Sequence, residues 1–91
     1  MKYELTDETT IEDGHQLTRI RALKNIPEYE VYRGDLGGFV ESTNNLSQEG
    51  SCWIDGDAKV YGDARILDGA WIHRNAIVGG NAIVKDNVII T

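Results

Sequence analysis

Asp55 and His73 are the two side chains whose types and spacing best suit proton-transfer chemistry. They lie eighteen residues apart, three times a six-residue spacing that recurs through the C-terminal half, so a repeating fold would place them side by side. A carboxylate beside an imidazole can orient the ring as a general base. The same spacing brings no serine, cysteine or second histidine beside them. We therefore favour a cross-strand polar pair and expect no catalytic residue.

The sequence indicates neither a metal centre nor a bound cofactor. His15 and His73 are the only histidines and Cys52 is the only cysteine. Two isolated histidines lack the ligand spacing of a zinc site, and one cysteine cannot form an internal disulfide. Because Cys52 takes the small inward position that precedes Ile54 in the repeat, we expect a buried thiol.

The elements that position these residues follow a six-residue period between Ile54 and Thr91. An aliphatic residue recurs every six positions, and a small residue follows each one four positions later. The aliphatic positions are Ile54, Val60, Ile66, Ile72, Val78, Val84 and Ile90, and the small positions are Ala58, Ala64, Ala70, Ala76, Ala82 and finally Val88. Pairs rich in Gly, Asp and Asn, which form tight turns, separate them. The period predicts short strands alternating with turns.

A period of six fits neither an α-helix nor a simple meander, and it favours an all-β chain wound into parallel coils. Three repeats make one triangular coil of eighteen residues, so residues eighteen apart stack at the strand spacing of about 4.8 Å. The pattern resembles the hexapeptide repeat of left-handed parallel β-helices, and the left hand follows from this resemblance alone. We expect a short left-handed parallel β-helix of about two to three coils with an N-terminal β-hairpin cap.

We expect a single domain, with residues 1–53 forming the N-terminal β cap and a degenerate coil, and residues 54–91 forming the regular hexapeptide-repeat coils. Apolar and polar residues alternate on both sides of the turn signal at 12–14, which predicts a β-hairpin. Residues 36–53 carry irregularly spaced apolar residues. They would supply the degenerate coil, because repeat solenoids need atypical ends.

The position just before each inward aliphatic residue points outward, and several of these positions carry large apolar side chains. On the first wall they are Trp53, Trp71 and Ile89, and the other walls add Ile77 and Ile83. An exposed apolar patch of this kind marks an interface. We predict self-association through Trp71, Ile77, Ile83 and Ile89 into a dimer or trimer that covers the last coil. The alternative is that the N-terminal cap folds over the tryptophans.

The formal net charge of −6 is unevenly distributed. Residues 1–53 hold ten acidic and five basic side chains, against five and four in residues 54–91. This acidic half disfavours nucleic-acid binding, which needs a basic face. The simpler interpretation is a solvated surface that aids solubility. If the acidic half contacts a basic partner, we expect Glu28, Glu30 and Asp35 to make the contact.

No apolar run of membrane-spanning length occurs, and no charged-then-apolar signal segment opens the chain. We therefore expect no membrane partner and a cytoplasmic location.

The segments RIRAL, GDLGGFVES, NLSQEGSCWI and DAKVYGDAR together resemble phage and prophage hexapeptide-repeat proteins, similar to the YdcK-like family. The resemblance covers nearly the whole chain and is most specific between Gly34 and Ile54. It implies a left-handed parallel β-helix and, for the longer members of the family, a transferase activity.

Two classes of function follow. We favour a non-enzymatic, self-associating binding module without cofactors, whose phage-like resemblance implies a host target, for example a defence nuclease such as a CRISPR effector that it inhibits, or a nucleotide signal that it sequesters. The alternative is a reduced acyl- or nucleotidyltransferase with its site between protomers and His73 as base beside Asp55.

Overall fold

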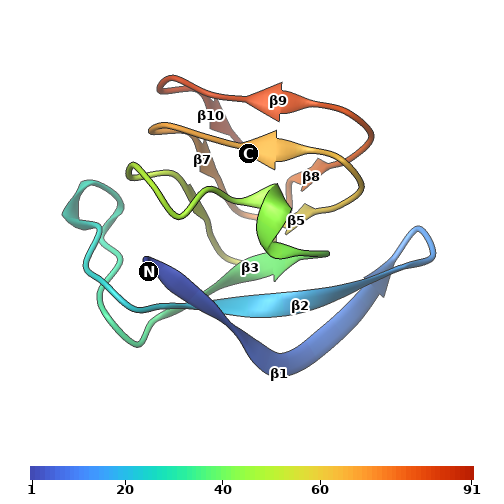
Figure 1. Cartoon of the computed structure of the whole chain (residues 1–91), viewed down its shortest axis with the longest axis horizontal. Helices are drawn as coiled ribbons and strands as arrows, with labels where there is room; N and C mark the ends of the chain where they lie inside the picture. Colours follow the sequence, from blue (N-terminus) through green and yellow to red (C-terminus); the bar gives the residue numbers. More distant parts are fainter.

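The structure is a computed structural model of residues 1–91, and it is all-β (Figure 1). Its strands are β1 (Tyr3–Glu12), β2 (His15–Ala22), β3 (Leu36–Val40), β4 (Trp53–Ile54), β5 (Lys59–Val60), β6 (Arg65–Ile66), β7 (Trp71–Ile72), β8 (Ile77–Val78), β9 (Ile83–Val84) and β10 (Ile89–Ile90), with two 3-10 helices, η1 (Pro27–Tyr29) and η2 (Thr43–Asn45). No helix has the length and apolarity that crossing a membrane requires.

The predicted hairpin is present as β1 and β2. The two strands pair antiparallel, and their last paired residues are Glu12 and His15. Asp13 and Gly14 form the two-residue turn with φ of 53° and 78°. Positive φ at both turn residues matches the right-handed twist of the flanking strands, which is why an Asp-Gly pair makes this turn.

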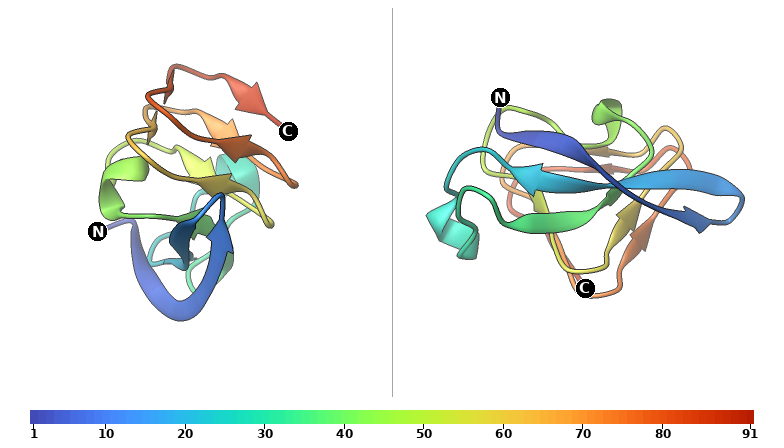
Figure 2. Two further views of the ribbon diagram at one scale, coloured as in Figure 1. Left: turned by 90° about the vertical axis from the view of Figure 1, so that its right-hand side faces the viewer. Right: turned by 90° about the horizontal axis from the view of Figure 1, so that it is seen from below.

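The seven short strands β4 to β10 confirm the eighteen-residue register. Each is two residues long, and the pairs Trp53 with Trp71, Lys59 with Ile77, Arg65 with Ile83 and Trp71 with Ile89 are all parallel. The pairs fall on three separate sheets, so the chain winds in three-sided coils. Figure 2 shows the coils stacked with the hairpin at one end and β9 and β10 at the other.

The first coil is irregular, as predicted for residues 36–53. Val40 pairs with Val60, and Leu46 pairs with Ile66, so both partners are twenty residues apart. Ile54 then pairs with Ile72 after eighteen residues. The first coil therefore holds two extra residues between Leu46 and Ile54.

The hairpin does not sit on the coils as a separate lid. It extends one wall, because one sheet runs in the order β1-β2-β3-β5-β8 and joins antiparallel to parallel strands. The other two sheets, β10-β7-β4 and β6-β9, are parallel. The five-stranded sheet is thus mixed, and the sheets are open at their edges, so the whole chain is not clearly the purely parallel stack that the sequence predicted.

The inward aliphatic and small residues form one continuous core with residues of the cap. Ile54, Ile66, Ile72 and Ala70 have no solvent exposure, and neither has Cys52, which confirms the predicted buried thiol. Burial falls off in the last coil, since no further coil packs against the side of it that faces away from the hairpin. Val84 there is 8% exposed, and Val88 is 48% exposed.

One polar side chain fastens the hairpin to the coils. Arg19 pairs with Glu8 and Asp57, donates to the Gly37 carbonyl at 2.7 Å and lies over the Phe39 ring. A guanidinium suits this role because its five donors and flat face serve several partners at once.

Buried Asn45 links the first coil to the second. Its Oδ1 accepts from the backbone N–H groups of Glu41 and Ser42, and its Nδ2 donates to the carbonyls of Gly62 and Ala64. All the polar groups of this fully buried amide are therefore engaged, which offsets the cost of burying it.

Ala70→Leu should destabilise the fold by about 1–3 kcal/mol, because Ala70 fills a corner with no room for extra methyl groups. The matched control is Ala82→Leu, since Ala82 holds the same repeat position but is exposed in the last coil. Chemical denaturation of both variants measures the difference. Equal stabilities for Ala70→Leu and the parent chain would show that the register is wrong.

Candidate functional site

Asp55 and His73 lie on neighbouring coils of one wall, as the spacing predicts, but no hydrogen bond or ion pair joins them. The Asp55 carboxylate accepts from the backbone N–H of Gly56 at 2.9 Å. The His73 ring stacks on Trp71, with 3.9 Å between ring centres and 4° between ring planes. The dyad in which Asp55 would orient His73 as a base is therefore not formed.

The predicted apolar ladder of Trp53, Trp71 and Ile89 is wrong for its two tryptophans. Trp53 has no exposure. Gly37 makes room for its indole, since a Cβ at Gly37 would lie 2.7 Å from the ring. Trp71 is half-buried, because the ring of Tyr29 from the cap stacks on it with 4.9 Å between ring centres. The Tyr29 hydroxyl donates to the Gly69 carbonyl. The cap covers this part of the wall, and self-association through Trp71 is not supported.

The outward isoleucines of the last coil remain uncovered. Ile77, Ile83 and Ile89 are 52%, 60% and 58% exposed, and Val88 is 48% exposed at a corner between them. We call these four residues the last-coil surface. Lys59 and Arg65 occupy the positions of Ile77 and Ile83 one coil earlier.

The predicted acidic contact residues lie together on the loop that contains η1. Glu28 and Glu30 are exposed and make no ion pair, and Glu30 adopts the left-handed conformation at the end of η1. Asp35 differs, because its carboxylate accepts from the Tyr32 backbone N–H at 2.9 Å and so shapes a turn. Glu28 and Glu30 can therefore contact a partner without losing an internal hydrogen bond, whereas Asp35 cannot.

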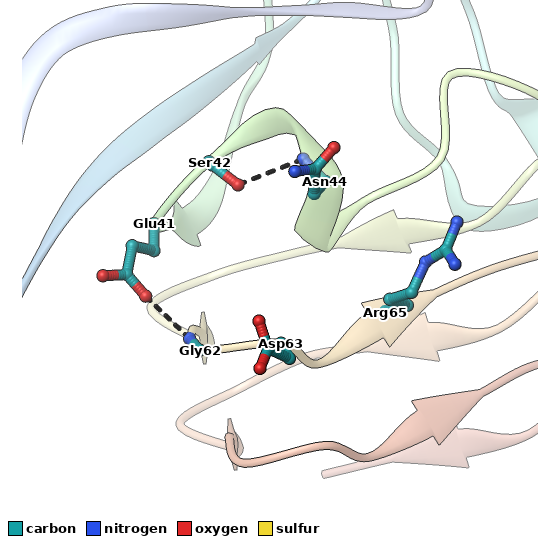
Figure 3. A pocket seen from close by; sticks show the side chains of 6 residues that line it. All are labelled: Glu41, Ser42, Asn44, Gly62, Asp63 and Arg65. Atoms are coloured by element: carbon teal, nitrogen blue, oxygen red, sulfur yellow. Dashed lines mark hydrogen bonds between the residues drawn. The ribbon is translucent and has the colours of Figure 1, made fainter.

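A polar groove of about 660 Å³ lies between η2 and the turn of the second coil, and its lining includes no hydrophobic residue (Figure 3). It is lined by Glu41, Ser42, Asn44, Gly62, Asp63 and Arg65. Ser42 is the N-cap residue that precedes η2, and its hydroxyl accepts from the Asn44 backbone N–H at 3.2 Å. The Ser-x-x-Asn spacing, with Ser42 and Asn45 at its ends, was the sequence signal for this capped turn, and sequence reasoning missed it.

His15 joins the hairpin to this groove. Its Nδ1 lies 3.0 Å from the Glu41 carboxylate, and its ring packs at 4.6 Å from that of Tyr61. Glu41 also accepts from the Gly62 backbone N–H at 2.7 Å. These two hydrogen bonds, that of His15 first, hold the pKa of Glu41 below its usual value, because they favour the charged carboxylate.

A scan against models of protein families and a search of curated proteins give no match to this chain.

The Glu41 carboxylate should titrate with a midpoint below the ordinary value of 4.5, and His15→Ala should move the midpoint upward. His73→Ala is the matched control, since His73 stacks on Trp71 and makes no contact with Glu41. NMR titration of the carboxyl carbon measures all three chains. A lowered folded-state pKa adds stability above the unfolded pKa that is lost as pH falls through the folded value. An unchanged midpoint in His15→Ala would contradict the assignment.

Proposed function

We propose that the chain is a non-enzymatic binding module that self-associates through its last-coil surface. We further propose that it is a short left-handed parallel β-helix, similar to the phage and prophage proteins of the YdcK-like family. The parallel pairs at eighteen-residue intervals and the three-sided coils support this architecture. The resemblance of the segment between Gly34 and Ile54 supports the family and supplies the left hand.

The exposure of the last-coil surface is the observation that carries the proposal. Four large aliphatic side chains, each about half exposed or more, follow one another around a single coil. The other exposed apolar residues of the chain, such as Leu5 and Ile11 on the hairpin, lie apart from this coil. Ile77, Ile83 and Ile89 lie on three different walls, so these residues ring the open end of the coils, and apolar exposure of this extent is typical of an interface between proteins. A second copy is the partner we propose, because a closed homo-oligomer buries the same side chains on every copy.

The stacking of His73 supports a binding role over the transferase alternative. A general base needs an orienting partner and access to the proton it removes. Here the ring lies flat on Trp71, and the Asp55 carboxylate accepts from the backbone N–H of the next residue, Gly56. A transferase site between protomers would require both side chains to leave these contacts.

We propose a host protein with a basic surface as the second partner. Glu28 and Glu30 project from the η1 loop, which is distant from the hairpin turn in Figure 1. Unpaired carboxylates on a rigid scaffold attract a basic partner and mainly raise the rate of association.

Ile83→Asp with Ile89→Asp should convert an oligomer into a monomer, because each change puts a charge into a dry interface. Light scattering behind a sizing column, at micromolar concentration, measures the mass. Ile11→Asp is the matched control, since Ile11 is 70% exposed on the hairpin. A parent chain that is monomeric, or an oligomer that tolerates the double change, would refute self-association by this surface.

Glu28→Lys with Glu30→Lys should slow association with the host protein and weaken the dependence of its rate on salt. The rates are measured on the purified partner by surface plasmon resonance at two salt concentrations. Asp7→Lys with Glu12→Lys is the control, because it makes the same change in charge on the hairpin. An association rate that changes neither with salt nor in the Glu28→Lys, Glu30→Lys variant would indicate that these acids serve only solubility.

A further inference from the structure

Cys52 is buried beside the side chain of Lys2. The thiol has no exposure, and Lys2 as a whole is only 4% exposed, which is unusual for a lysine. The Lys2 Nζ lies 3.2 Å from the Cys52 Sγ. The two residues are fifty positions apart in the chain, so the fold alone brings this amine and this thiol into contact.

Backbone carbonyls hold the amine at the sulfur. Lys2 Nζ donates to the carbonyl of Cys52 at 2.6 Å, and to those of Gly50 and Glu49 at 3.3 and 3.4 Å. The sulfur is therefore nearer to Nζ than two of the three carbonyl oxygens are. Burial lowers the pKa of Lys2 below its usual value, which increases the fraction of neutral, nucleophilic amine.

A groove of about 460 Å³ adjoins this pair on the side of Lys2. Lys2 forms part of its wall together with Gln48, Glu49, Gly50 and Ser51, and Lys24 lies on the same groove. The segment from 47 to 51 lies in the part of the first coil that holds the two extra residues. A small oxidant in the groove would contact Lys2, whose Nζ lies 3.2 Å from the buried Cys52 sulfur, so it reaches the thiol when the cap opens locally at Lys2.

We infer that Lys2 and Cys52 form a modification site at which peroxide oxidation joins Nζ to Sγ in a covalent sulfenamide. In the first step hydrogen peroxide oxidises the thiol to a sulfenic acid and is reduced to water. In the second step the neutral amine attacks the sulfur, the N–S bond forms, and the S–O bond breaks. The sulfenic oxygen leaves as water with a proton from the amine, so the cross-link holds two hydrogen atoms fewer than the reduced chain.

The cross-link would tie the start of β1 to the first coil. It would also remove the Lys2 charge from the groove and close a loop of fifty residues, which restricts the unfolded chain. A thiol reductant would reverse it by attacking the same sulfur. The cross-link requires only the contact between Lys2 and Cys52, so it forms whether or not the chain self-associates.

The test is treatment of the folded chain with hydrogen peroxide, followed by intact mass measurement and peptide mapping. We expect a mass lower by two hydrogen atoms, a peptide containing Lys2 joined to one containing Cys52, and the original mass after addition of a thiol reductant. A gain of oxygen on Cys52 without a linked peptide, or no change in mass, would overturn the inference.

Two variants identify the reacting groups. Lys2→Arg keeps the positive charge but removes the nucleophilic amine, so the linked peptide should be lost, and Cys52→Ser should lose it too. Lys24→Arg is the matched control and should keep it, because Lys24 lies on the groove but is not among the hydrogen-bond partners of Cys52. Circular dichroism checks that each variant is folded. In the parent chain the yield should rise with pH as Lys2 loses its proton, and a yield that falls with pH would also overturn the inference.

Discussion

The eighteen-residue backbone register is the constraint on which the rest of the structure depends. The N–H of Trp53 donates to Ala70, that of Trp71 to Val88 and that of His73 to Ile90, so each coil is bonded to the next at the same offset. The register holds only if every turn has the same length and shape. One residue per repeat adopts positive φ to achieve this, and the six are Gly56, Gly62, Asp68, Arg74, Gly80 and Asp86. Glycine and aspartate tolerate this conformation, whereas Arg74 adopts it at a cost that the surrounding ladder offsets.

The cap packs on the first coil, which departs from that register. Two extra residues between Leu46 and Ile54 displace the chain, and polar contacts replace the lost regularity. Buried Asn45 bonds to four backbone groups across the first two coils, and Lys2 bonds to three carbonyls of the irregular segment. Both side chains satisfy backbone groups that a regular repeat would satisfy with its neighbour.

The sequence was sufficient to predict the register and the inward residues, because period and turn chemistry are local properties. It predicted the facing pairs of the last two coils and the hairpin turn for the same reason. It gave the covering of the tryptophans by the cap only as an alternative, and it did not predict which residues of the cap lie there. Tyr29 lies over Trp71 because of the path of the η1 loop, and Gly37 admits Trp53 because β3 crosses close by. Asp55 and His73 were placed on one wall correctly, but the stacking of His73 on Trp71 depends on side-chain packing that repeat spacing does not describe.

The same register distinguishes the inward residues, which folding requires, from the outward residues, which form the surface. Lys59 and Ile77 occupy equivalent positions on successive coils, as do Arg65 and Ile83, and the backbone pairs both sets in the same way. The inward residues change little between these coils, so folding makes similar demands on each. Folding does not account for the change from charged to aliphatic side chains, so the surroundings of the outer surface are the remaining explanation. A charged second coil favours contact with water, and an aliphatic third coil favours contact with protein. The outward positions can thus vary without a change of fold, and they are where we propose that the chain meets its partners.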